Sequence, residues 1–267
     1  MEEKIFFEHF LFGDGNEIVI NDNMFCVDRI LMFPQIRPLQ IEKAVRLAIE
    51  YCQINEFRWN LLEKSNKCPV LIYKLYKRGV FVFEEIEPYL DGRDTFLLSI
   101  YFRKDIDDFR SFIQFKYKPI GFAQSFFENE NDIDQMIEYG FIPSSIEYCL
   151  KYDSIDDLED FNILEQEVQW SPFEWSSQPK YLDLLSFSGF FGSIKCFKHL
   201  FLQGFVINDN VTSMVVCSGC IDLYHICQRE KSLSAEIISM ASEFCHLSLL
   251  VFMLENGADI NTKTNNF

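Results

Sequence analysis

The sequence lacks the motifs by which most nucleotide-binding proteins and hydrolases are recognised. GxSxG, GxGxxG and the phosphate-binding GxxxxGK followed by Ser or Thr are all missing from its 267 residues. Each of these motifs works through its spacing, so a partial match carries no chemistry. Only four histidines are present, and none lies in a recognisable catalytic motif. The sequence therefore predicts no enzyme activity, no catalytic residue and no cofactor.

Positive charge and long apolar runs are also scarce. Lys and Arg number 24 against 41 Asp and Glu, so the formal net charge is −17, and no basic stretch offsets it. Such a chain repels phosphate backbones. The longest nearly apolar run, LSLLVFML at 247–254, is far shorter than the roughly 20 residues that a membrane helix needs. We therefore expect no nucleic-acid partner and no membrane association.

Signals for secretion are missing as well. The N-terminal MEEKIFFEHFLF has no basic region, and Glu8 and His9 interrupt its apolar run. The nine cysteines are odd in number and lack the spacing of a disulfide framework, so we expect reduced thiols. Together these features predict a cytoplasmic protein.

The segment LSLLVFMLENGADIN, residues 247–261, predicts a helix that ends at a glycine. Its apolar residues share one helical face: Leu247, Leu250, Met253 and Leu254. Gly257 follows the last turn, where glycine takes the left-handed conformation without a Cβ penalty, so we expect a positive φ there. The segment defines a template with an apolar residue at a base position, apolar residues 3, 6 and 7 positions later, and glycine at position 10.

The template recurs upstream at intervals of about 30 residues, within the range typical of solenoids. Residues 184–208 align without a gap with residues 237–261, and Gly204 there matches Gly257. We therefore expect three helix pairs over 181–267. The template bases are Pro69, which suits a first helical turn, and then Ile106, Ile133, Ile155, Ile194, Ile221 and Leu247.

The segment FCHLSLLVFMLENGADINTKTN, residues 244–265, resembles the second helix and exit loop of an ankyrin repeat. The resemblance extends over 181–267 and, in degenerate form, over 40–165. The order of these regions along the chain resembles that of divergent ankyrin proteins from protists. It implies an all-α solenoid of stacked helix pairs that serves as a protein–protein interaction scaffold. The TPLH opening of ankyrin repeats is missing and the spacings fall short of 33 residues, which implies shortened or lost hairpin fingers.

The resemblance also implies where a partner binds, because ankyrin proteins use their exit loops and concave helix face. Carried over by position, the partner-binding candidates are Asn208, Asp209, Asp259, Asn261, Lys263 and Asn265. Taken singly, each of these residues is explained better by helix termination and turn formation than by partner binding. The partner itself is an unidentified protein.

The chain divides into four predicted parts: an N-terminal arm or hairpin-bearing segment at 1–35, a degenerate helical repeat region at 36–168, a loop at 169–180, and ankyrin-like repeats at 181–267. The sequence GDGN at 13–16 predicts the turn of a small β-hairpin. Trp170 and Trp175 are expected to hold the loop down. An adaptor with a BTB-like oligomerisation segment at its N-terminus is an alternative interpretation, and an enzyme with an unrecognised site is a third.

The densest group of metal-ligand residue types is CSGCIDLYHIC at 217–227. Three residues have the spacing of zinc-knuckle ligands: Cys217, Cys220 and His225. The fourth ligand would fall at Glu230, which breaks the pattern. Cys227 instead occupies the template position of Leu200 and Met253, where a free cysteine serves as a small core residue. We therefore expect no metal.

The sequence stops where the next repeat would begin. A helical array without a terminal cap exposes apolar residues that the next repeat would cover. We therefore expect the chain to be a piece of a longer array, or its last pair to stack on something else. The apolar residues expected to be shared between core and uncovered face are Ile237, Ile238, Leu249, Leu250 and Met253. Self-association through this last pair is the expected consequence.

The incomplete ligand set predicts that chelators leave the fold unchanged. Treatment with EDTA should not shift the thermal unfolding midpoint, because no metal-binding free energy is coupled to folding. Differential scanning calorimetry with and without EDTA measures this directly. A sharp fall in the midpoint would show that the cysteine cluster holds zinc.

Overall fold

The computed structural model describes residues 27–28, 30–31, 41–91, 96–109, 111–112, 130–163, 168–171, 173, 181–230, 235–244 and 246–258. Almost every regular element in these residues is a helix, which confirms the expected all-α class. The predicted hairpin turn at 13–16 and Trp175 lie outside the described residues. The chain forms two compact units, with the boundary between residues 141 and 142 and with Ser171 and Phe173 belonging to unit 1.

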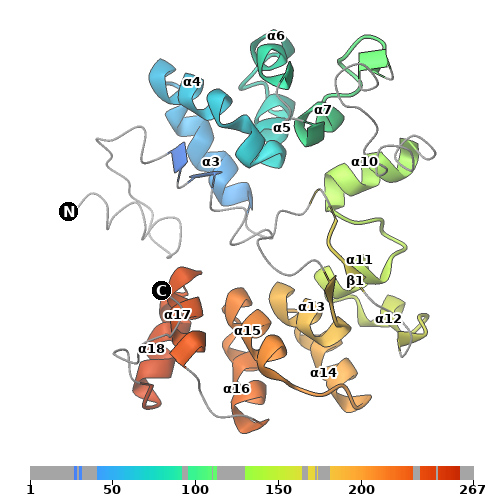
Figure 1. Cartoon of the computed structure of the whole chain (residues 1–267), viewed down its shortest axis with the longest axis vertical. Coiled ribbons are helices and arrows are strands. Elements are labelled where there is room, and N and C mark those ends of the chain that lie inside the picture. Colours follow the sequence, from blue (N-terminus) through green and yellow to red (C-terminus); the bar gives the residue numbers. More distant parts are fainter. Residues whose placement is uncertain are drawn as a thin grey trace. The chain divides into compact units, whose positions relative to one another are not determined.

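Unit 1 is built of short helices (Figure 1): α3 (Ile41–Tyr51), α4 (Asn55–Glu63), η2 (Ser65–Lys67), α5 (Pro69–Lys77), α6 (Phe83–Ile86), η3 (Glu87–Asp91), α7 (Phe96–Tyr101) and α10 (Glu130–Tyr139). Helices α3, α5 and α7 pack against one another in that order. Ion pairs bridge elements that lie about 30 residues apart, as in Glu42 to Lys74 at 3.1 Å. Unit 1 is therefore tied together partly at its surface.

Unit 2 is a series of helix pairs: α11 (Ile146–Lys151) with α12 (Ile155–Leu158), α13 (Leu184–Phe191) with α14 (Ile194–Leu202), α15 (Asp209–Ser218) with α16 (Ile221–Glu230), and α17 (Ala235–Glu243) with α18 (Leu247–Glu255). The first helices α11, α13, α15 and α17 contact one another in order, and α12, α14 and α16 do the same. Figure 1 shows α13, α15 and α17 in one row and α14, α16 and α18 in a second. The three helix pairs expected over 181–267 are confirmed.

The helix starts follow the template closely. Helices α5, α12, α14, α16 and α18 begin at the expected bases, with Pro69 in the first turn of α5. The base at Ile106 is wrong, because residues 102–108 form turns and Asp108 has a φ of 47°. The Asp108 side chain instead accepts a hydrogen bond from the Ser111 backbone at 3.4 Å. Short acidic side chains compete with the helix backbone in this way and favour helix starts over interiors.

Three of these helices end in the same turn, which confirms the expected role of Gly257. Gly79, Gly204 and Gly257 have φ values of 70°, 96° and 89°. In each turn the residue after the glycine donates its backbone N–H to a carbonyl inside the last helical turn, the pattern of a Schellman cap. These bonds run from Val80 to Leu75 at 3.0 Å, from Phe205 to Leu200 at 3.3 Å, and from Ala258 to Met253 at 3.0 Å. The three acceptor residues are fully buried.

The junction inside each pair is also repeated. In three of the pairs a left-handed residue stands two positions before the second helix: Asp153, Gly192 or Gly219. At two junctions the residue directly before the second helix reaches back to the preceding pair: the Ser193 hydroxyl donates to the Leu150 carbonyl, and the His246 ring nitrogen Nε2 lies 2.6 Å from the Cys217 carbonyl. Both carbonyls belong to the penultimate residue of a first helix. We call these two contacts the junction latches.

Asp153 adds a third link between neighbouring pairs. Its carboxylate accepts hydrogen bonds from the backbone N–H groups of Lys195 at 3.2 Å and Cys196 at 2.9 Å. These groups belong to the first turn of α14, where backbone donors have no partner within the helix. A carboxylate is favoured there by the helix dipole as well. One acidic side chain therefore fixes α14 to the end of α11.

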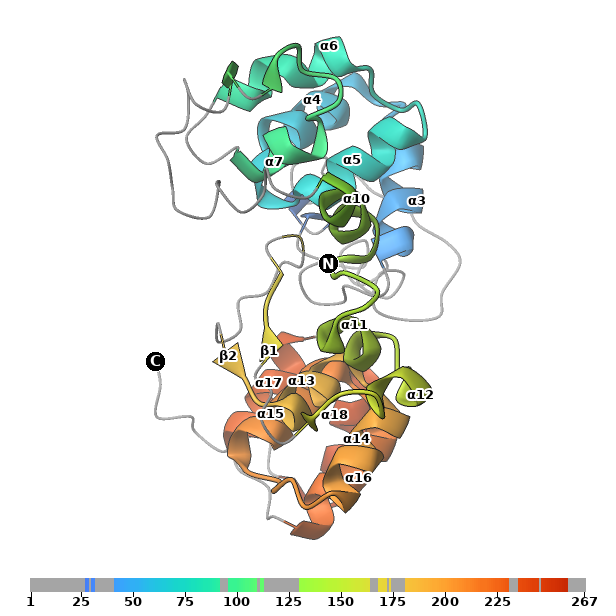
Figure 2. The ribbon, with the colours of Figure 1, turned by 90° about the vertical axis from the view of Figure 1, so that its right-hand side faces the viewer.

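The segment before α13 is held down as the sequence predicts, and it also contains a strand pair that the sequence did not. The Trp170 ring lies 5.0–5.7 Å from three aromatic rings of α13, those of Phe187, Phe190 and Phe191. Strand β1 (Val168–Gln169) pairs antiparallel with β2 (Tyr181–Leu182), as seen in Figure 2. Two-residue strands carry too little periodicity to be recognised from sequence.

The close approach of the His246 ring to Gly219, between α15 and α16, can be tested by substitution. A Cβ atom at Gly219 would lie 2.1 Å from His246 Nδ1, whereas a Cβ at Gly204 would meet nothing within 4 Å. Because the latch to Cys217 holds the imidazole, Gly219→Ala should cost about 3 kcal/mol, the sum of left-handed strain and overpacking. Gly204→Ala carries the strain alone and should cost about 1 kcal/mol. Native-state hydrogen exchange of α15 measures both, and equal costs would refute the close contact.

Candidate interaction surface

The segment between α14 and α15 contains the two partner-binding candidates that the structure describes. Asn208 caps α15, because its side-chain oxygen accepts a hydrogen bond from the Val211 backbone at 2.9 Å. Its carbonyl also accepts a bond from the Thr212 hydroxyl at 3.1 Å. Asp209 begins the helix and is exposed, which suits the positive end of the helix dipole. Both residues therefore have the structural role that was the alternative explanation for them.

The other four candidates, Asp259, Asn261, Lys263 and Asn265, lie outside the described residues. The structure consequently brings together two of the six predicted contact residues. Asn208 and Asp209 follow the Schellman turn of α14, so their position is set by Gly204 and by the cap of α15. This places two polar side chains at a well-defined point on the surface of unit 2.

Two exposed apolar side chains flank the same turn and were not predicted. Leu202 is 84% exposed and Val206 is 76% exposed, whereas Ile207 between Val206 and the cap is buried. Residues 202–209, which we call the exit segment, thus combine apolar and acidic side chains. The signal was present in the ungapped alignment, where Leu202 matches Glu255 and Val206 matches Asp259. An apolar residue in a column that is acidic elsewhere marks an exposed position.

The last helix has a second exposed apolar face. Leu247, Val251 and Leu254 are 65%, 44% and 36% exposed, and we call them the α18 outer face. Of the five residues expected to be shared between the core and an uncovered face, Ile237, Ile238, Leu249 and Met253 are buried and Leu250 is half-buried. The sequence did not divide them, because burial depends on which side of α18 meets α16 and α17, and the periodicity of the segment does not settle that.

Two cysteines of the segment 217–227 lie in the core of unit 2, whereas Cys220 is half-buried and His225 is exposed. Cys217 and Cys227 are buried, which confirms the core role expected for Cys227 beside Leu200 and Met253 in the template. Burial raises the pKa of the Cys227 thiol to about 12, so it is protonated at neutral pH. In the described part of the chain, no group of three or more His, Cys, Asp or Glu residues is placed to hold a metal ion.

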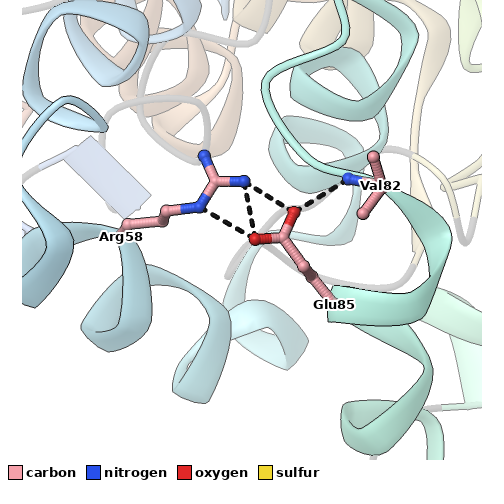
Figure 3. Close-up of polar contacts among 3 residues, drawn as sticks. All are labelled: Arg58, Val82 and Glu85. Atoms are coloured by element: carbon pink, nitrogen blue, oxygen red, sulfur yellow. Dashed lines mark hydrogen bonds and ion pairs between the residues drawn. The ribbon is translucent and has the colours of Figure 1, made fainter.

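A polar cluster of unit 1, which we call the clasp, joins α4 and α6 (Figure 3). Arg58 donates from Nε to Glu85 Oε1 at 3.0 Å and from Nη2 to both carboxylate oxygens at 2.7 and 2.6 Å. The Val82 backbone N–H donates to the same carboxylate at 2.9 Å. The Arg58 guanidinium also lies 4.6 Å from the centre of the Phe81 ring. This geometry holds two helices together and leaves Glu85 with an interaction on both oxygens.

The clasp fixes the ionisation of Glu85. Hydrogen bonding to Arg58 is the main cause that lowers the pKa of this carboxyl below its ordinary value, and the Val82 N–H acts in the same direction. A carboxyl group that acts as a general acid or base near neutral pH needs a raised pKa, whereas the pKa of Glu85 is lowered. The cluster therefore serves unit 1 as a structural ion pair.

Comparisons with protein-family models, with curated proteins and with solved structures found no match. The ankyrin resemblance therefore remains a prediction. Within the described ranges, every helix is too short or too polar to cross a bilayer.

The clasp predicts a pH-dependent stability of unit 1. Arg58→Met should destabilise unit 1 by about 1–2 kcal/mol at pH 7, because a partly buried charge-assisted pair is lost. Glu85 has a lowered pKa in the folded state, so the stabilisation is present above its unfolded pKa and is lost as pH falls through the folded value. The difference between wild type and variant should therefore shrink well below pH 4.

Lys104→Met provides the matched control. Lys104 pairs with Asp134 at 2.7 Å, but its side chain is 70% exposed, and such surface pairs contribute little. Urea unfolding at neutral and acidic pH, followed in unit 1, measures both variants. An Arg58→Met effect that is no larger than the Lys104→Met effect would contradict the structural role of the clasp.

Proposed function

We propose that this chain is a non-catalytic protein–protein interaction scaffold, a solenoid of the ankyrin type whose stacked helix pairs present their connecting segments to a partner. Support comes from the repetition of local geometry: α5, α14 and α18 share one exit turn, and the first three pairs of unit 2 share a left-handed residue at their junction. Repeated units that contact only their neighbours build a continuous surface on a stable core.

The exit segment carries this proposal. Leu202 and Val206 keep most of their surface in water. The neighbouring helices α13 and α15, in contrast, bury their large apolar side chains. Apolar residues beside polar ones at a loop on a rigid scaffold are typical of binding sites. Asp209 and the net charge of −17 favour a partner whose contact surface is apolar and basic.

The length of the connection is consistent with a shortened form of ankyrin repeat. Helix α14 ends at Leu202 and α15 begins at Asp209, so residues 203–208 are the entire connection. This segment holds a Schellman turn and a helix cap, with no strand among its residues. The hairpin finger implied by the family is thus replaced here by a short turn.

The alternatives named from sequence gain no support from the described residues. An adaptor with a BTB-like segment would need a sheet within residues 1–35, most of which lie outside the described ranges. An enzyme would need histidine, cysteine and carboxylate side chains that converge, and the polar clusters of the described residues are ion pairs and caps. The interaction scaffold is therefore the function that we propose.

Loss of the apolar pair in the exit segment tests the proposal. The whole chain, carrying Leu202→Ser with Val206→Ser, should lose at least about tenfold in affinity for a partner that the wild type captures, because buried contact area is removed at the site. Affinity capture with mass spectrometry identifies the partner, and titration calorimetry with that purified partner gives the affinity.

Lys198→Ser is the matched control, because Lys198 is exposed on α14 outside the exit segment. This variant should bind as the wild type does. Equal affinities for wild type and the double variant would show that the exit segment is not the contact. Chemical turnover of the captured molecule would refute a non-catalytic role.

A further inference from the structure

The α18 outer face has the arrangement of a surface that packs against another helix. Leu247, Val251 and Leu254 are separated by four and three positions, so they lie on one side of the helix. Leu249 and Met253 of the same helix are fully buried, whereas these three large apolar side chains stay exposed. A stripe of this kind in water favours association.

The residues of α14 and α16 that align with Leu247, Val251 and Leu254 show how far this side of a second helix is covered inside unit 2. In α16, His225 stands at the position of Val251, and its ring lies 4.6 Å from the Phe252 ring of α18. In α14 the positions of Leu247 and Leu254 are Ile194 and Phe201, which are half-buried in an array where α14 contacts α16. At the position of Val251 both Lys198 and His225 are exposed, so this side of a second helix is partly covered in the array while its centre stays in water.

The α18 face is more apolar than the interior faces that it resembles. Its central residue is Val251, whereas α14 has Lys198 and α16 has His225 at that position. Helix α18 contains no charged residue before Glu255, its last residue. Two copies that meet through these side chains would therefore bring no like charges together, although each chain carries a net charge of −17.

We propose that the α18 outer face is a homodimer interface, in which two copies pack their α18 helices antiparallel about a twofold axis. The spacing is self-complementary: with the axis beside Val251, Leu247 of one copy lies opposite the partner's Leu254, and the two Val251 side chains lie next to each other. An interface of this isologous type closes at two copies, whereas head-to-tail stacking of arrays would continue into filaments. The proposal does not depend on the exit segment or on its partner.

Sedimentation equilibrium of the whole chain over a wide concentration range tests the interface. The wild type should show a reversible monomer–dimer equilibrium with no larger species. Val251→Lys and Val251→Glu should each weaken dimerisation at least about tenfold, because each places two like charges beside the axis. Lysine is compatible with the helix at this position, because α14 carries Lys198 there.

Two further measurements separate the interface from effects on folding or on general solubility. An equimolar mixture of the Val251→Lys and Val251→Glu chains should recover the dimer, because opposite charges then meet at the axis. Leu202→Lys changes a more exposed apolar residue outside the face and should leave the dimer intact.

Several results would overturn the proposal. These are a wild type that stays monomeric at all concentrations, assemblies larger than two, charged variants at Val251 that dimerise like the wild type, or a mixture of the two that stays monomeric. Loss of the dimer in Leu202→Lys would also overturn it, by moving the contact to the exit segment. Binding of a different protein to the α18 outer face of a monomeric chain would assign the face to that partner.

Discussion

Close contact between successive first helices is the constraint on which unit 2 depends. Every residue of α13 is buried, and a Cβ atom at Gly189 would lie 2.9 Å from the Val215 side chain of α15. Only a residue without a side chain allows the two helices to approach this closely. The Asn210 side chain then donates to the buried Ser186 hydroxyl at 3.1 Å, which ties the start of α15 to α13. The spacing between these two pairs, and with it the position of the exit segment that joins them, follows from this contact.

The two units solve the problem of joining neighbouring elements in different ways. In unit 1 the links are ion pairs and hydrogen bonds between exposed or half-buried side chains, such as Arg58 with Glu85 and Tyr76 with Asp105 at 2.7 Å. In unit 2 several links run to backbone groups instead: the junction latches reach carbonyls, and Asp153 reaches amides. Buried backbone partners impose a single geometry, because an unmet polar group in the core is costly. This explains why the repeats of unit 2 are the more regular.

The contacts at the helix ends also explain why the exit segment and the α18 outer face can remain exposed. Asp153 accepts from backbone amides at the start of α14 and the Schellman turn satisfies a carbonyl at its end, so the Leu202 and Val206 side chains are not required to hold these ends in place. The same holds for the α18 outer face, since α18 is fixed by the latch of His246 and by the buried Leu249 and Met253. Both surfaces are rigidly positioned and available for contacts. A rigid site loses little conformational entropy on binding, which favours affinity.

The amino-acid sequence alone determined the features of this protein that depend on neighbours along the chain. Apolar spacing and one glycine set the starts of α14, α16 and α18 and the exit turns at Gly204 and Gly257, because helix periodicity and left-handed caps are local properties. An ungapped alignment also placed Cys227 in the core.

Tertiary structure decided the features that depend on neighbours in space. Ile106 fitted the apolar pattern, yet the acidic residues around it form turns, and the β1–β2 pairing joins segments too short to be recognised. The latch between His246 and the Cys217 carbonyl crosses 29 residues, and no local pattern specifies it. Exposure of Val206 and Val251 was decided in the same way: a side chain is buried only if another helix lies over it, and that is set by how the pairs pack.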